Sequence, residues 1–318
     1  MSSIYVGALS VLAPGIASCW DGTTPWSMSL SGIDHNAPVD AQAHLAGVKH
    51  RYFNDTSRFS VAAARLCLAN GANLAWHELD ETSRGVIIGT TVADYAVRDR
   101  LDREVLAHGV RTINAISAPN VSANIASAYV SIESRARAFA TTSTSPFLAG
   151  LESLAIGALA LRAGKADTLL AIGAEEALPH DTTPITPGAV CVCLQRQPGR
   201  SGRAILDFHC GHHADGSTRP LQKDAARFLR AAAQRAAAAP EIVAIRDRSA
   251  HGENTAQAWR RQAACAGLSV TPNDLPLDDE GAVAPLLAAV PSFTGSNHIV
   301  LLAIYRGRYV ALSIAPSI

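Results

Sequence analysis

The apolar positions of this chain follow two patterns, and together they predict a mixed α/β fold. Short, nearly continuous apolar runs are typical of strands that are covered on both faces. The predicted strands are Ile4–Val11, Val86–Thr90, Thr168–Gly173, the stretches "GAVCVCLQR" and "AILDFHC", which we expect to pair with each other, "EIVAIRD", and a closing hairpin "HIVLLAIY"–"RGR"–"YVALSI".

Between these runs, apolar residues recur at helical spacing. In the segment 57–70, Phe59, Ala62, Ala63, Leu66 and Cys67 share one face. Further helices are predicted in "PNVSANIASAYVSI", along the stripe from Leu151 to Leu159 with Gly164 just beyond it, and over Lys223–Ala239, Glu253–Ala266 and Ala282–Val290.

Strands and helices alternate in both parts of the chain, which indicates two similar halves packed together. The stretch "ALPHDTTPITPG" is rich in proline, threonine and glycine, so we place the join there. The predicted organisation is an N-terminal half at residues 1–180 and a C-terminal half at 181–318, forming one compact unit.

Composition narrows the possible partners. The 318 residues are 48% hydrophobic, with 27 basic and 27 acidic side chains, so the net charge is zero. No charge surplus favours nucleic acid or an acidic membrane, and no stretch approaches the roughly 20 apolar residues of a membrane helix. We therefore expect a cytoplasmic protein that binds neither. The six cysteines are scattered and form no CxxC motif.

Candidate chemistry is concentrated in "ATTSTSPFLAGLESLAIGALALRAGKADTLLAIGAEE", residues 140–176. The turn before its helix is a place where an enzyme could present a nucleophile, yet it holds Pro146, Phe147 and Leu148. Ser143, Thr144 and Ser145 precede the tip of the turn, and a hydroxyl needs a positioned base to react. "FHCGHHADG" holds metal-ligand residue types in no closed zinc pattern, so a solvated turn is favoured over a metal site.

Several stretches resemble, in order along the chain, the β-ketoacyl synthases of the thiolase fold. "IYVGALSVLAPG" is similar to the family's opening strand, "INAISAPNVSANIASAYVSI" to the segment before the nucleophile, and Gly150-Leu151 to the Gly-Leu after the family's T-A-C-A-S-G. "LRAGKADTLLAIGAEE", "TPGAVCVCLQR", "SAHGENT" and "SFTGSNHIVLL" resemble later family segments, the last one the F-G-F-G-G-x-N strand. The resemblance implies a layered αβαβα arrangement.

The departures from the family pattern carry the functional information. Counting back from Gly150, Phe147 occupies the position of the family's catalytic cysteine. His251 matches the first catalytic histidine, and Asp278 stands where the second would be. A ketosynthase needs the thiolate to take an acyl chain from a carrier protein and the two imidazoles to promote decarboxylation of a malonyl group. Phe147, His251 and Asp278 are therefore read as degenerate positions, and no catalytic residue, metal or cofactor is expected.

The family includes partners that have lost the cysteine, and the resemblance implies this role. Such a chain-length factor pairs with an active ketosynthase in type II polyketide or polyene biosynthesis, shapes the tunnel for the growing chain, and meets the acyl carrier protein indirectly. One alternative is an acyltransferase or decarboxylase on the same fold that uses His251 as a base. Another is a structural or metal-binding module built from the histidine cluster.

Two segments are implied to face the partner. The strand near Arg137–Thr142 would pair across the dimer interface. The helix Ala93–Gly109 would contribute tunnel residues that set chain length, with Tyr95, Arg98, Leu101 and Asp102 as candidates. An ordinary amphipathic surface helix is the competing interpretation, because charged residues are dense from Arg98 to Glu104.

Overall fold

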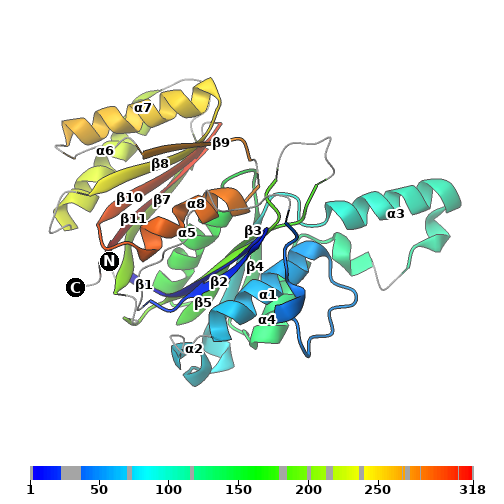
Figure 1. Ribbon diagram of the computed structural model, residues 1–318. Helices are drawn as coiled ribbons and strands as arrows, with labels where there is room; N and C mark the ends of the chain where they lie inside the picture. Colours follow the sequence, from blue (N-terminus) through cyan, green and yellow to red (C-terminus); the bar gives the residue numbers. More distant parts are fainter. Residues whose placement is uncertain are drawn as a thin grey trace.

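A computed structural model describes residues 3–22, 37–69, 74–114, 118–178, 185–198, 202–212, 218–235, 240–266, 268, 273–279, 281–306 and 308–316. The expected mixed α/β fold is confirmed (Figure 1). The strands are β1 Ile4–Ala13, β2 Ile16–Trp20, β3 Arg84–Thr90, β4 Phe139–Thr144, β5 Thr168–Glu175, β6 Gly188–Gln195, β7 Arg203–His212, β8 Glu241–Asp247, β9 Asn273–Leu277, β10 Ile299–Tyr305 and β11 Arg308–Pro316. The helices are α1 Asp55–Ala69, α2 Leu74–Glu78, α3 Tyr95–His108, α4 Ile125–Ser134, α5 Ala149–Arg162, α6 Thr218–Arg235, α7 Ala250–Cys265 and α8 Val283–Thr294.

The strand order repeats itself. One run is β4-β3-β5-β6-β1 and the other is β9-β8-β10-β11-β7. In each run the first three strands are mutually parallel and the last two join antiparallel. A short antiparallel pairing of β1 with β7 connects the runs, from Ile4 opposite Ile205 to Val6 opposite Arg203.

The expectation that "GAVCVCLQR" and "AILDFHC" pair with each other is wrong. These segments form β6 and β7, and β1 lies between them in the sheet. β1 can take this central place because almost all of its residues are buried, so it is covered on both faces and can pair along both edges. Adjacent strands in the sequence are therefore separated in space by the first strand of the chain.

Three hydrophobic clusters position the helices. The largest contains the apolar faces of α5 and α8 together with residues of both strand runs, so these two helices lie between the runs. α1 and α4 pack on the other face of the first run, and α6 and α7 on the other face of the second. Figure 1 shows the same succession, with α3 extending away from the body.

Several local expectations are refined. α6 begins at Thr218, earlier than the predicted Lys223. Of "SFTGSNHIVLL", the first three residues end α8, and only the part from Ile299 onward is strand. The predicted division at residues 180 and 181 falls in 179–184, outside the described residues, and it stays a prediction. No described helix has the length and apolar character that a membrane span would need.

Candidate functional site

The site is built around the turn between β4 and α5. β4 ends at Thr144 and α5 begins at Ala149, and Phe147 in the turn has φ 64°, in the left-handed region that non-glycine residues rarely adopt. Its side chain is 0% exposed and stacks on Tyr305 at the end of β10, with ring centroids 5.5 Å apart and planes inclined by 17°. The predicted nucleophile position is therefore a tight turn closed by two aromatic rings.

Glycines allow the backbones around this turn to approach closely. A Cβ added at Gly89 of β3 would lie 1.9 Å from the carbonyl oxygen of Ala149. A Cβ added at Gly150 would lie 2.3 Å from the carbonyl oxygen of Ala282, which precedes α8. Such distances are far below van der Waals contact, so only glycine fits at these positions. The N-termini of α5 and α8 consequently meet beside the end of β3.

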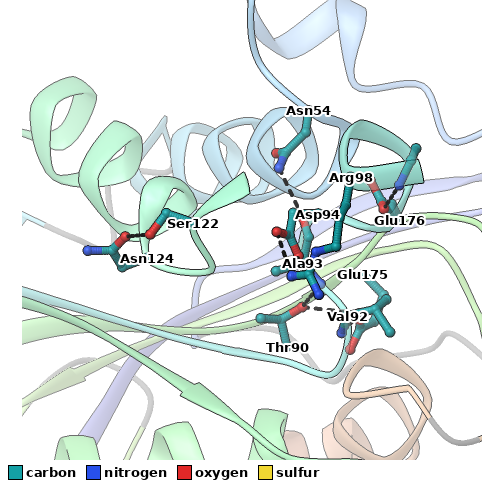
Figure 2. A network of polar contacts seen from close by, with 11 residues as sticks. Asn54, Thr90, Val92, Ala93, Asp94, Arg98, Ser122, Asn124, Glu175 and Glu176 are labelled. Atoms are coloured by element: carbon teal, nitrogen blue, oxygen red, sulfur yellow. Dashed lines mark hydrogen bonds and ion pairs between the residues drawn. The ribbon is translucent and has the colours of Figure 1, made fainter. Parts of the chain in front are cut away.

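Glu175 holds the loops around this meeting point together (Figure 2). Its carboxylate accepts hydrogen bonds from Thr90 Oγ1 at 3.1 Å, from the backbone N–H groups of Thr91 and Val92, and from the N–H of Ala282 at 3.0 Å. Burial raises the pKa of the Glu175 carboxyl, and the donated hydrogen bonds oppose that rise. One buried side chain thus fixes both the loop after β3 and the start of α8.

Asp278, the predicted position of the second imidazole, lies at the surface. Asp278 follows β9, its side chain is 64% exposed, and its carboxylate pairs with Arg248 at 2.8 Å. The neighbouring Asp279 makes the structural contacts, accepting from the N–H groups of Thr186 at 2.6 Å and Gly281 at 2.7 Å. Asp278 is therefore an ion-paired surface carboxylate.

His251 lies in the first turn of α7. The helix is capped by Ser249, whose Oγ accepts from the N–H of Gly252 at 3.0 Å. The ion pair between Arg248 and Asp278 brings the start of α7 next to the end of β9. The side chain of His251 lies outside the described part of the chain, so its role stays a prediction.

The hydroxyls before the turn are not activated. Ser143 Oγ donates to Glu152 Oε2 at 3.1 Å, and Thr144 is exposed. Ser145 is buried, and its Oγ has no hydrogen-bond partner among the described residues. A serine nucleophile needs a positioned base that accepts its proton. Arg308 also forms an ion pair with Glu152, so this carboxylate is held in a contact between α5 and β11.

A second acidic group, which the sequence reasoning did not single out, lies beside Glu175. Glu176 is buried and accepts from the N–H of Ala96 in the first turn of α3 at 2.7 Å (Figure 2). Burial raises its pKa to about 7, aided by the nearby carboxylates of Asp55, Asp94 and Glu175. In the sequence, the signal that could have indicated this group is the pair Glu175-Glu176 at the end of a buried strand.

The tunnel candidates all lie on α3 and face different surroundings. Leu101 is buried, as is Val97 one turn before it. Tyr95 is half-buried, Asp102 is exposed, and Arg98 is exposed while its guanidinium binds both carboxylate oxygens of Asp94 at 2.8 Å. Only a narrow strip of α3 therefore faces the body of the protein, and the role of these residues in setting chain length stays a prediction.

The segment implied to form an interface is a free edge of the sheet. β4 covers Phe139–Thr144 and pairs only with β3 among the described strands. Most of its residues are exposed or half-buried, unlike those of every other long strand of this run. The exposed face of α5, which follows β4, carries Ile156 at 39% exposure and Leu159 at 55%.

The histidine cluster does not assemble a metal site in the described part of the chain. His209 lies on β7 with its ring 5.6 Å from that of Tyr309, and Cys210 next to it is exposed. The side chains of His212, His213 and Asp215 lie outside the described residues. Among those described, no three cysteine, histidine or acidic side chains are placed to share a metal ion.

A comparison with known protein families gives a match that includes the turn at Phe147. Residues 29–185 match the family described as "Beta-ketoacyl synthase, N-terminal domain". No curated protein sequence matches the chain.

Solved structures match over the whole length. "The ishigamide ketosynthase/chain length factor" aligns with a TM-score of 0.71 at 16% identity, covering 99% of both chains. A type II polyketide synthase acyl carrier protein "in complex with its ketosynthase bound to the hexaketide" gives 0.75 at 12% identity, again over 99% of both. A β-ketoacyl synthase from Burkholderia phymatum STM815 gives 0.61 at 16% identity over 100% of both. At these identities the similarity shows the fold.

Proposed function

We propose that this chain, whose residues 29–185 match the β-ketoacyl synthase N-terminal domain family, is a catalytically silent subunit of the chain-length-factor type. It pairs with a cysteine-bearing ketosynthase in type II polyketide or related polyene biosynthesis. In that pair the ketosynthase performs the condensation and meets the carrier protein directly, while this chain shapes the tunnel.

The observation that carries the proposal is Phe147. The turn keeps the backbone form of a site that presents one side chain at the start of a helix, with φ 64° and close glycine contacts on both sides. Yet the side chain presented is a phenyl ring, fully buried against Tyr305. A phenyl ring cannot be acylated, and a helix N-terminus that would lower the pKa of a thiol has no effect on it. The turn serves packing.

The repeated strand order supports the fold assignment. We interpret the two runs, with α5 and α8 between them and α1/α4 and α6/α7 outside, as the two similar halves of an αβαβα thiolase fold. The two helices between the runs meet at their N-termini, where the family would carry its reaction.

The free edge of β4 supports pairing with a second subunit. An edge strand presents unpaired N–H and C=O groups that a strand from a partner can satisfy. The neighbouring α5 adds exposed aliphatic side chains, Ile156 and Leu159. Joining here would build a large apolar interface of the obligate class, above about 2,000 Å².

Co-expression with ketosynthase subunits from the same organism tests the proposal. We expect a 1:1 complex that condenses malonyl units only while the partner keeps its cysteine. An acyl thioester should label the partner and leave this chain unlabelled. Condensation or acyl transfer by the isolated chain, or a stable monomer that binds no ketosynthase, would overturn the proposal.

A further inference from the structure

A groove between α5 and α6 lies on the side of the molecule where α5 is exposed. It has a volume of about 510 Å³ and combines apolar and basic side chains. The residues lining it are Leu159, Arg162, Ala163, Asp207, Phe208, His209, Arg227, Phe228 and Ala231. Nothing in the site around Phe147 uses this groove.

The groove carries more positive than negative charge. Its carboxylate, Asp207, already has two cations beside it, Arg162 at 3.7 Å and Arg235 at 3.5 Å. Arg162 also lies over the ring of Phe208, 4.8 Å from its centroid, so it covers the apolar floor. Arg227, at the rim, is exposed and makes no ion pair with any described residue.

The excess of positive charge at the groove continues along α6. The helix contains five basic residues and one acidic residue, a surplus of four positive charges in a chain whose net charge is zero. Lys223, Arg227 and Arg230 are exposed at spacings of four and three residues, so they line one face of the helix. Within the described residues neither Lys223 nor Arg230 has an acidic partner. Such a row would favour an acidic surface laid against it.

The groove is continuous with the free edge of the sheet. Glu152 in the first turn of α5 accepts a hydrogen bond from Ser143 of β4. Ile156 and Leu159 follow at one-turn intervals on the same exposed face of α5, and Leu159 lines the groove. A subunit that pairs with β4 would therefore extend over this strip toward α6.

We infer that the groove between α5 and α6 receives an acidic segment of the partner ketosynthase, which places an apolar side chain on Leu159 and Phe228 and carboxylates against Arg227 and Arg230. This inference rests on the proposed heterodimer. It adds a basic contact to an interface that would otherwise consist of sheet pairing and apolar packing, and it would help this chain to choose a ketosynthase over a second copy of itself.

The test measures the dissociation constant of the complex with the ketosynthase that co-purifies with this chain. Arg227→Glu combined with Arg230→Glu should weaken the complex about tenfold or more at 0.1 M salt, with a smaller loss at 1 M salt, where screening acts within about 3 Å. Leu159→Ser should weaken it at both salt concentrations. Arg261→Glu, a charge reversal on the exposed face of α7, is the matched control and should stay within about twofold.

The outcomes separate this inference from the proposed function. If the complex forms and all variants bind like wild type, the groove inference is wrong and the heterodimer stands. If the wild-type chain binds no ketosynthase, the proposed function itself fails. If the double variant keeps its ketosynthase affinity but loses binding to the carrier protein, the groove has a different occupant, and the inference is likewise overturned. Circular dichroism of each variant confirms that it is folded.

Discussion

The turn at Phe147 and the helix α3 differ in how far their apolar side chains are exposed to solvent. Phe147, Leu148 and Ala149 are all 0% exposed, in a turn enclosed by α5, α8 and β10. In α3 only Val97 and Leu101 are buried, and Leu106 is 87% exposed. The turn where β-ketoacyl synthases carry their nucleophile is closed in this chain, whereas α3 extends away from the body (Figure 1). The contrast indicates that packing maintains the turn, whereas α3 is available to another molecule.

The largest expected effect comes from emptying the closed turn. Phe147→Ala should lower the free energy of unfolding by about 3–5 kcal/mol, since a fully buried ring is removed and Tyr305 loses its stacking partner. Leu106→Ala, on exposed α3, is the control and should change it by no more than about 0.5 kcal/mol. Urea unfolding followed by circular dichroism measures both. Equal effects would show that Phe147 is not a packing residue.

A smaller effect is expected at Glu176, which joins the body to α3. Its folded pKa of about 7 lies above the usual 4.5, so the folded state holds the proton more tightly than the unfolded state. Its contribution to stability is therefore full below pH 4.5 and is lost as the pH rises through about 7, a change of roughly 3 kcal/mol.

Glu176→Gln keeps an oxygen for the N–H of Ala96 and removes the charge. The variant should be more stable than wild type at pH 8, and its free energy of unfolding should vary less between pH 5 and 8. Glu133→Gln, at an exposed position of α4, should leave that profile unchanged. Parallel profiles of wild type and Glu176→Gln, measured by urea unfolding across this range, would contradict the assignment.

Substitutions of the tunnel candidates on α3 should have a still smaller effect on the stability of this chain. In complexes with the ketosynthase, Tyr95→Ala and Leu101→Trp should shift the length of the product and leave the rate of the first condensation largely unchanged. Mass spectrometry of the released chains is the measurement. Identical products from assembled complexes of both variants would assign length control to another element and leave α3 as an ordinary surface helix.

The last prediction is that adding a thiol does not create condensing activity. Phe147→Cys places a thiol in the turn before α5, but the isolated chain should still not condense malonyl units. Asp278 holds no imidazole and pairs with Arg248 near the surface, so the enolate would lack one of its two stabilising groups. Release of carbon dioxide from malonyl thioesters is the assay. Sustained condensation by this variant alone would show that the site has been assigned incorrectly.

Local patterns in the sequence were enough to predict most of the elements. Nearly continuous apolar runs indicated β1, β3, β5 and β8, and helical spacing indicated α1, α5 and α8, because burial on one or both faces imposes the period of the element. The position of Phe147 also followed from the sequence, since Gly150 and Leu151 mark the start of the helix. β2, α2 and β9 were not predicted, because short elements leave too few positions to show a period.

Tertiary structure alone decided which segments meet. No local pattern indicates that β1 separates β6 from β7, because strand order depends on contacts between residues far apart in the chain. The same holds for Glu175, whose partners Thr90 and Ala282 lie 85 and 107 residues away, and for the stacking of Phe147 on Tyr305. The sequence determined that the turn before α5 holds an aromatic residue, Phe147, and no cysteine. Packing determined that this ring is sealed inside the protein, since only the assembled helices and strands can exclude water from it.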